Sequence, residues 1–359
     1  MEAATKEVED KNNDEKAMAV NDKAPVRPRG RPFFQRRWTT LDKRSAGLLL
    51  FLHLLCLLAP FHFTWSAFCL AFLLYNFTGL FGLTLSYHRH LSHKSFKLPK
   101  WLEYTFAYIG VLTLQGDPID WVSTHRYHHQ FVDTDRDPHS PKQGFWFGHI
   151  AWIFDSYGLT KKVCPKHVED FEERNRKRKR FRNIFVGCLK YGRPNNVEDL
   201  QKQAFYRFLR TTYILHHFGL AIVLYAVGGL PFLVWGMGVR TVCFQHVTFS
   251  LNSIGHMWGN QQWNTGDQSR NNWVLALLIF GEGWHNNHHA FEYSARHGLE
   301  WWQLDVTWWV ILLLQALGVP SSKCYEKFLK EEKAKGRQRR GQEVSAVVEP
   351  IGGRLYSLT

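Results

Sequence analysis

The stretch AFCLAFLLYNFTGLFGLTLSYHRHLSH, residues 67–93, carries an apolar run that ends directly in three closely spaced histidines. The run at about 67–87 is near the ~20 residues that a helix needs to cross a membrane. Another apolar run, at about 46–65, precedes it across the short joint PFHFTWS. A second pair of runs, at about 209–228 and 231–251, is divided by GGLP. The sequence therefore predicts an all-α integral membrane protein with four transmembrane helices in two hairpins.

Lysine and arginine indicate which side of the membrane each segment faces. Neither joint contains these residues, whereas the flanks at 27–44, 89–100, 161–210 and 323–340 are rich in both. Positive flanks stay on the cytosolic side, so both joints are expected in the lumen and both termini in the cytosol. The net charge of +14 is explained by these flanks, and no nucleic-acid partner is expected.

Polar segments bound the predicted domain, residues 45–320. Residues 1–44 are expected to be a disordered tail, and their acidic, serine-free composition is unlike a transit peptide or a secretory signal. Residues 321–359 are expected to be a polar tail, and the charged stretch 161–190 is expected to be a cytosolic loop. The six cysteines contain no CxxC pair, so neither a disulfide framework nor a cysteine-zinc site is expected.

Nineteen histidines include three short clusters, HRHLSH at 88–93, HRYHH at 125–129 and HNNHH at 285–289. In the second and third clusters, residues three and four apart share one helix face. His88 and His93 are five apart and need a helix end or a bent turn to converge. Imidazole suits iron, zinc, copper and nickel. Without His90, which stands between His88 and His93, the clusters supply eight histidines. Eight exceed the needs of one ion, so a two-metal site is predicted.

Several alternatives compete with this interpretation. Zinc is the main rival metal, but its sites usually need only three or four ligands and often include cysteine. No HExxH motif occurs, which disfavours a zincin protease. A receptor that only binds metal remains open, whereas a transporter would need more ionisable residues within the spans. The scattered histidines are expected to be ordinary packing or interfacial residues, and His90 is expected not to be a ligand.

The clusters and their surroundings resemble the membrane-bound acyl-CoA and acyl-lipid desaturases, most closely the plant branch of the stearoyl-CoA-type delta-9 desaturases. The likeness runs from about residue 35 to 320 through SYHRHLSHKSFKLPKWLEY, QGDPIDWVSTHRYHHQFVDTDRDPHSP, NSIGHMWG and GEGWHNNHHAFEYSARHGLEWWQLD. It implies a cytosolic helical cap that holds two Fe(2+) ions. The implied ligands are His88, His93, His125, His128, His129, His256, His285, His288 and His289, with Asn252 holding a metal-bound water. The stretch VCPKHVEDFEERNRKRKRFRNIFVGCLK departs from the family pattern.

The resemblance also implies a kinked acyl tunnel whose bend is lined by Gln115, Trp121 and Thr248. Carboxylates near the clusters are candidates to orient the imidazoles: Asp117, Asp120, Asp133, Asp135, Asp137 and Glu282. No catalytic residue is expected beyond the metal ligands.

The expected reaction is the insertion of a cis double bond, at delta-9, into a saturated acyl chain carried by CoA or by a lipid. O2 would be the oxidant, and cytochrome b5 with its reductase would supply electrons at the endoplasmic reticulum membrane, to an active site on the cytosolic face. A related di-iron hydroxylase or oxidase, and a delta-7 acyl-lipid desaturase, are the alternatives. Chain length and the nature of the acyl carrier stay open.

Overall fold

The computed structural model describes residues 36–163 and 196–319, and the described residues from Arg37 onward belong to one compact unit. The regular elements among these residues are all helices, joined by loops, and the described residues contain no strand beyond two isolated bridges. The all-α prediction is thereby confirmed for this part of the chain. Residues 1–35, most of the charged loop and the C-terminal tail lie outside the described residues.

The first long helix, α2, spans Thr40–Leu57 and begins earlier than the apolar run predicted. Its start is fixed by a capping box: Asp42 N–H donates to Thr39 Oγ1 at 3.2 Å, and Thr39 N–H donates to Asp42 Oδ2 at 2.8 Å. The buried Asp42 also accepts from the backbone of Ser156, which anchors α2 to the start of α7. A 3₁₀ turn, η2 (Ala59–His62), then forms the first part of the predicted joint, residues 60–66.

The second long element combines α3 (Trp65–Phe77) with the π-helical η3 (Thr78–Ser92), without a break. η3 packs closely on α4 (Lys100–Val111), where Gly82 faces Gly110. A Cβ added to Gly82 would lie 2.5 Å from the backbone nitrogen of Gly110, so the contact requires the absence of a side chain. Small residues at such a contact let two helix backbones approach each other.

The third long element folds back on itself. It consists of α10 (Ala204–Leu233), the π-helical η7 (Val234–Val239), α11 (Arg240–Ser253) and the short turn η8 (Ile254–His256). The chain reverses at Gly228 and Gly229, and the latter has φ 64° and ψ −154°. Only glycine adopts such backbone angles readily, which explains why GGLP forms the joint.

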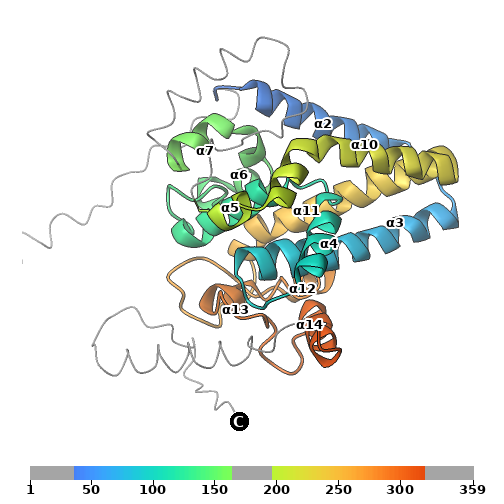
Figure 1. The fold of residues 1–359 in the computed structure, drawn as a ribbon. Helices are drawn as coiled ribbons and strands as arrows, with labels where there is room; N and C mark the ends of the chain where they lie inside the picture. The colour runs from blue at the N-terminus through green and yellow to red at the C-terminus, as the bar shows by residue number, and fades with distance from the viewer. Residues whose placement is uncertain (1–35, 164–195, 320–359) are drawn as a thin grey trace, which may run out of the picture. The chain divides into compact units, whose positions relative to one another are not determined.

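Within residues 36–163 and 196–319, two helical stretches are long and apolar enough to cross a membrane, Trp65–Ser92 and Ala204–His256. The second contains the reversal and therefore both runs of the second predicted hairpin. Figure 1 shows α2, α3, α10 and α11 extending toward one side. These helices carry large exposed apolar side chains, such as Phe51, Phe72 and Ile222. Extended apolar surface of this kind indicates contact with lipid.

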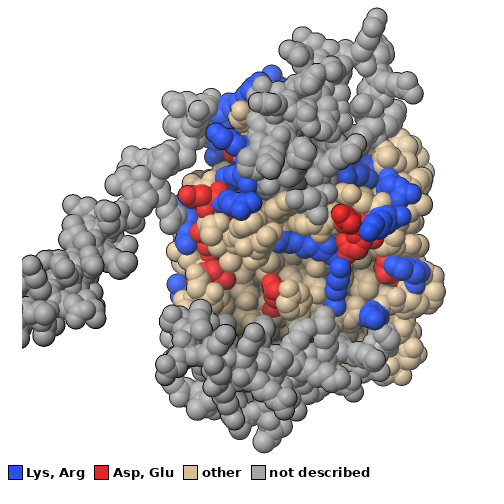
Figure 2. All heavy atoms as spheres, turned by 60° about the vertical axis from the view of Figure 1, so that its left-hand side comes forward, with Lys and Arg blue, Asp and Glu red and all other residues tan. Residues whose placement is uncertain are grey.

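Short helices gather at the other end of the long ones (Figure 1). They are α5 (Pro118–Phe131), η4 (Pro141–Gln143), α6 (Phe145–His149), η5 (Ala151–Phe154), α7 (Ser156–Val163), α9 (Glu198–Gln201), α12 (Trp273–Leu278), α13 (His285–Ala290) and α14 (Val306–Ala316). Figure 2 looks more directly onto this end and shows basic and acidic side chains gathered there. The contrast with the apolar long helices separates a polar cap from an apolar bundle.

Candidate metal centre

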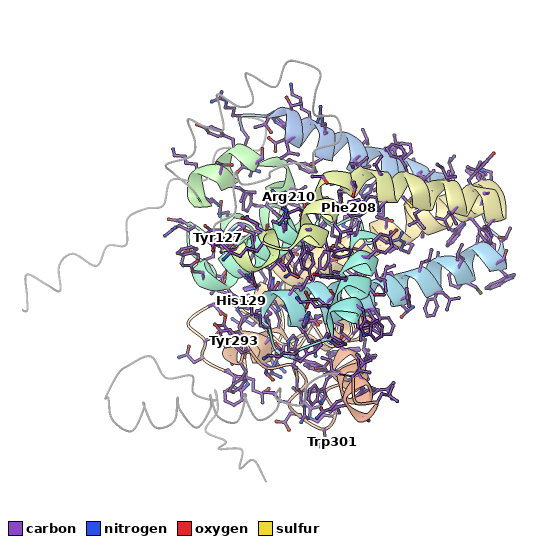
Figure 3. All side chains as sticks on the ribbon, viewed as in Figure 1. Tyr127, His129, Phe208, Arg210, Tyr293 and Trp301 are labelled. Carbon is purple, nitrogen blue, oxygen red and sulfur yellow. The ribbon has the colours of Figure 1, made fainter. Side chains whose placement is uncertain are left out.

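Four segments bring the three histidine clusters and one further histidine together. η3 and its C-cap carry the first cluster, α5 the second, α13 the third, and η8 carries His256. The ring nitrogens form two groups, and within each group one nitrogen from every residue lies within 4.8 Å of all the others. The first group is His88, His93, His125, His129 and His288, and the second is His128, His256, His285 and His289. Figure 3 labels His129 between Tyr127, which lies on the same helix, and Tyr293, which lies in the segment after α13.

The π-helix explains how two histidines five positions apart can share a site. A π-helix is closed by hydrogen bonds between residues five apart, which brings such residues back to one face. The backbone N–H of His93 donates to the carbonyl of His88 at 3.2 Å. Their ring centroids lie 4.8 Å apart, on the side that faces His125. The bent turn expected from the sequence is therefore an extended π-helical segment.

Within each group the Nε2 atoms point at one another. The distances are 3.2 Å for His88–His288, 2.8 Å for His93–His125, 3.0 Å for His129–His288, 3.0 Å for His256–His285 and 3.1 Å for His285–His289. Nitrogens that bind one ion at about 2.1 Å, at roughly right angles, lie about 3 Å apart. Two sets of converging imidazole nitrogens therefore fit two metal ions.

Carboxylates contact the opposite nitrogen, Nδ1, of five of the nine rings. The pairs are His88–Glu282 at 2.6 Å, His128–Asp137 at 3.1 Å, His129–Glu292 at 3.4 Å, His256–Asp133 at 3.1 Å and His289–Asp267 at 3.0 Å. A ring that donates its Nδ1–H to a carboxylate presents an unprotonated Nε2, the form that binds a metal. The carboxylates thus fix the orientation of these rings.

The electrostatic surroundings keep most of these rings neutral. Burial, followed by the neighbouring imidazoles, holds the pKa of His93, His125 and His129 well below the ordinary value. The same causes lower the pKa of His285 and His288. Neutral imidazoles keep a lone pair for a cation and repel one another less than imidazolium ions would. The site is therefore suited to metal ligation rather than to anion binding.

The six carboxylates proposed from the sequence divide into two sets. Asp133, Asp137 and Glu282 contact histidine rings. Asp117 instead caps α5, Asp120 pairs with Arg210 at 2.8 Å, and Asp135 is exposed.

The sequence analysis missed two carboxylates, Asp267 and Glu292, that contact ligand rings. Glu292 follows the third cluster by three residues, so its place in the sequence could have indicated a contact with a ligand ring. Asp267 lies in a loop, and nothing near it in the sequence indicates its contact.

His90 is engaged at both ring nitrogens and contributes to neither group. Nδ1 lies 2.9 Å from the carbonyl of Phe96, and Nε2 lies 3.2 Å from Glu103 Oε2. His139 and His297, which the sequence analysis treated as ordinary packing, lie beside the groups. Their ring centroids lie 4.5 Å from His128 and 4.4 Å from His288, respectively.

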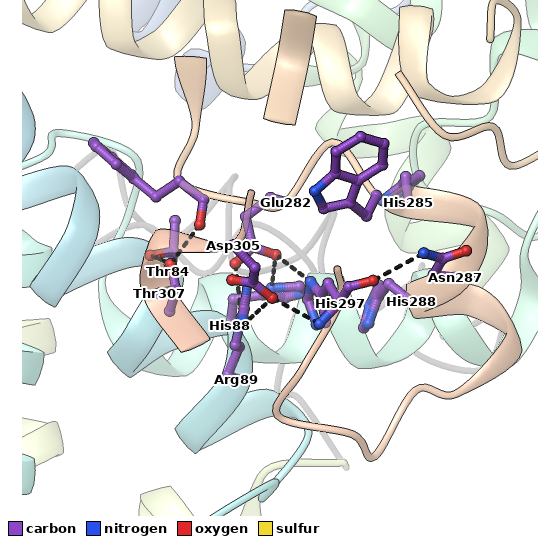
Figure 4. A network of polar contacts seen from close by, with 12 residues as sticks. Thr84, His88, Arg89, Glu282, His285, Asn287, His288, His297, Asp305 and Thr307 are labelled. Atoms are coloured by element: carbon purple, nitrogen blue, oxygen red, sulfur yellow. Dashed lines mark hydrogen bonds and ion pairs between the residues drawn. The ribbon is translucent and has the colours of Figure 1, made fainter. Parts of the chain in front are cut away.

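A buried arginine connects the first group to the rest of the cap (Figure 4). Arg89 is fully buried; its Nε donates to Glu282 Oε1 at 3.0 Å, and its Nη2 pairs with Asp305 at 2.8 Å. The other oxygen of Glu282 contacts His88 and also lies 3.1 Å from His297 Nδ1. The guanidinium compensates the charge of two carboxylates that would otherwise be costly to bury.

A cavity of about 540 Å³ adjoins both groups, and His88, His125, His128 and His285 form part of its wall. Gln115, Trp121, Thr248 and Asn252 also line it. Gln115 Nε2 donates to Thr248 Oγ1 at 2.6 Å, and the Trp121 ring stacks on His125 with centroids 5.1 Å apart. The residues that the resemblance assigned to the bend of a tunnel thus share one cavity with the histidines.

Comparisons with known proteins agree with this geometry. The model of the family described as fatty acid desaturase matches residues 63–316. The chain is 58% identical over 287 residues (80% of this chain, 70% of the relative) to palmitoyl-monogalactosyldiacylglycerol delta-7 desaturase, chloroplastic, of Arabidopsis thaliana. It is 54% identical to icosanoyl-CoA 5-desaturase of Limnanthes douglasii over 81% of this chain and 74% of that one. It is 49% identical to delta-9 acyl-lipid desaturase 1 of Arabidopsis thaliana over 86% of this chain and 92% of that one.

The family match begins after α2 and covers the other long helices and every segment that carries a histidine cluster. It confirms the resemblance seen in the sequence. The chain therefore belongs to the fatty acid desaturase family of oxidoreductases.

Proposed function

We propose that this desaturase inserts a cis double bond into a saturated fatty acyl chain held in the 540 Å³ cavity. The observation that carries the proposal is the juxtaposition of two convergent histidine groups with one wall of that cavity. The proposed position is delta-9, with delta-7 as the alternative, because relatives bear both names.

The two histidine groups would each hold one iron ion, with Asn252 on the cavity wall completing the site. Reduced iron there would supply the oxidising power, drawn from O2, that removes hydrogen from an unactivated methylene. The protein's own residues do the rest. The carboxylates at Nδ1 orient the imidazoles, and burial of the groups excludes water.

The acyl chain would be positioned by Gln115, Trp121 and Thr248. The hydrogen bond between Gln115 and Thr248 joins the segment before α5 to α11, on the wall that the histidines share. Trp121 covers His125 with its indole face and offers an apolar surface to a methylene chain. Such fixed contacts would determine which two carbons lie nearest the histidines.

The enzyme would span the endoplasmic reticulum membrane four times, in two hairpins, with its histidines on the cytosolic face. Support comes from the two apolar stretches, from the reversal at Gly228 and Gly229, and from the exposed apolar side chains of α2. The charged cap visible in Figure 2 would face the cytosol. Cytochrome b5 and its reductase would deliver electrons there.

Expression of the full chain in a desaturase-deficient yeast tests the reaction. We expect a new monounsaturated fatty acid, identified by mass spectrometry of derivatives that mark double-bond positions, and two irons per purified chain. His125→Ala should abolish the product and lower the iron content, whereas His62→Ala, in the turn η2, should change neither. A hydroxylated product would contradict the desaturase assignment. Substantial activity with full iron in His125→Ala would contradict the ligand assignment.

A further inference from the structure

Arg240 is a buried cation that the proposed reaction does not use. It lies at the start of α11, in the apolar run at 231–251 that is expected to cross the membrane, and it is 2% exposed. Within residues 36–163 and 196–319, no carboxylate forms an ion pair with it. A charge at such a place is costly and commonly marks a functional site. An apolar side chain would fill the same space at lower cost, so the hydrogen bonds of Arg240 indicate its role.

The guanidinium of Arg240 donates to two main-chain carbonyls. Nε contacts the carbonyl of Gly236 at 2.9 Å, because the backbone N–H of Arg240 is drawn by the π-helical geometry of η7 to Trp235, one position earlier. Nη1 donates to the carbonyl of Leu112, the C-cap of α4, at 2.7 Å. The last carbonyls of a helix have no partner within it, and its dipole attracts a cation there. Arg240 therefore holds the first residue of the α4–α5 turn, residues 112–116.

Other side chains of α10 and α11 hold the rest of the α4–α5 turn. Gln245 Nε2 donates to the carbonyl of Leu114 at 2.9 Å, and the backbone N–H of Gly116 donates to the hydroxyl of Tyr213 at 2.9 Å. Three side chains of α11, taken in order, thus contact three residues of the turn in the same order. The pairs are Arg240–Leu112, Gln245–Leu114 and Thr248–Gln115.

The backbone of the α4–α5 turn needs such support. Leu114 has φ 59°, in the left-handed region that residues other than glycine rarely adopt. A conformation of this kind persists only where the surrounding structure fixes it. Leu114, Gln115 and Gly116 all line the cavity that the histidines share. A change in the turn would therefore move the cavity wall relative to the histidines.

We propose that Arg240 and Gln245 are positioning residues that determine where the double bond forms. They act by holding the carbonyls of Leu112 and Leu114, and thereby the part of the cavity wall formed by the α4–α5 turn. Without these contacts the turn, and the carbons held against it, would take up more than one position relative to the histidines. The inference rests on the proposed function, because it requires an acyl chain in the cavity.

Gln245→Leu tests the second contact, because leucine is similar in size but has no donor for the carbonyl of Leu114. The full chain is expressed in a desaturase-deficient yeast, and double-bond positions are determined by mass spectrometry. We expect the ratio of the main to the minor position to fall about fivefold, a factor that corresponds to the loss of one ordinary hydrogen bond. Total product should fall less than this ratio, and the iron content per purified chain should be retained.

Amide hydrogen exchange of the purified chain in lipid nanodiscs measures the turn without turnover. We expect residues 112–116 to exchange faster in Gln245→Leu, because a less firmly held segment opens more often. Ser250→Ala is the matched control on α11. Its hydroxyl donates to the carbonyl of His246 at 2.8 Å, so the change removes a hydrogen bond of the same kind without touching the turn. Neither the exchange of residues 112–116 nor the isomer ratio should change in this control.

Two substitutions of Arg240 separate its hydrogen bonds from its bulk. Arg240→Met keeps a long, flexible side chain but removes every donor. Arg240→Lys keeps a cation whose single ammonium lacks the planar fork of a guanidinium. We expect the isomer ratio to be lowest in Arg240→Met and intermediate in Arg240→Lys. Should Arg240→Met fail to fold, Arg240→Lys and Gln245→Leu still test the inference.

The possible outcomes separate this inference from the function on which it rests. An unchanged isomer ratio in Gln245→Leu overturns the inference, whether or not the turn exchanges faster. Equal ratios in Arg240→Lys and Arg240→Met overturn the role of the Arg240 donors. Absence of any unsaturated product from the unaltered chain contradicts the proposed function instead, whereas faster exchange in Gln245→Leu still supports the holding of the turn by this residue.

Discussion

Glu282 shows how one carboxylate can serve both a ligand ring and the protein core. Its Oε2 contacts His88 Nδ1 at 2.6 Å, and its Oε1 accepts from Arg89 Nε at 3.0 Å. Arg89 is held in turn by Asp305 and by the carbonyl of Ala295. All residues in this series of contacts are buried, so the geometry of the contacts does not depend on solvent. The orientation of His88 therefore depends on Glu282 and, through Glu282, on Arg89 and Asp305.

Glu282→Gln tests this dependence, because the amide has the same shape without the charge. We expect iron affinity to fall by about 10- to 100-fold, the usual cost of losing such a partner, with a parallel loss of product. The measurement is iron retained per chain during dialysis against graded chelator concentrations. Glu198→Gln, an exposed change on α9, is the control. Retention like that of the unaltered chain would mean that Glu282 does not support the site.

At this scale the sequence identified the members of both histidine groups but not all of their partners. Clustered histidines are rare enough to be recognised in one chain, whereas His256 required the family resemblance because it has no histidine neighbour. Asp267 contacts His289 across 22 positions of sequence. No local pattern encodes such a contact, because it depends on how a loop folds back over α13.

Among the elements, η3 is the one whose form the sequence specified least. Its apolar run predicted a helix, but the change from α-helical to π-helical geometry at Thr78 has no pattern in the residues themselves. The spacing of His88 and His93 was the only hint. The small residues Gly82 and Gly110 form a contact that becomes apparent only when η3 and α4 are packed together.

Gly82→Ala tests how tightly η3 and α4 are held together. The new methyl would lie 2.5 Å from the backbone of Gly110, and such overpacking typically costs about 1–3 kcal/mol. We expect a lower thermal midpoint in detergent, followed by weaker iron retention, because η3 carries His88 and ends at His93. Gly47→Ala on α2 meets no atom within 4 Å and should be neutral or slightly stabilising. Equal midpoints for the two variants would contradict the close packing.

Across the whole described chain, the helical class was predictable, whereas the number of membrane spans is still a prediction. α2 contains Asp42, Lys43 and Arg44 within its 18 residues, so composition alone does not mark it as a span. The two runs of the second hairpin are one continuous helical stretch by length, and only the dihedrals of Gly228 and Gly229 divide it. Periodicity reports apolar length, but not the point at which a chain reverses.

The cavity is the feature that depends most on the whole molecule, since α2, η3, α5, α10 and α11 all contribute to its wall. The bond from Gln115 Nε2 to Thr248 Oγ1 joins positions 133 residues apart, beside the histidines. If this bond fixes the bend of the acyl chain, its removal should affect where the double bond forms more than whether it forms. Thr248→Val keeps the volume of the side chain but removes the hydroxyl.

We therefore expect Thr248→Val to retain iron and to yield a mixture of double-bond positions, because the unpaired Gln115 amide no longer holds a single arrangement. The ratio of positional isomers in yeast lipids measures this loss of fidelity. Thr241→Val is the matched control on α11: its buried hydroxyl has no hydrogen-bond partner among the described residues, so one isomer should persist. A single unchanged isomer in Thr248→Val would contradict this role of the hydrogen bond. The apolar wall around Trp121 would then determine the position of the double bond.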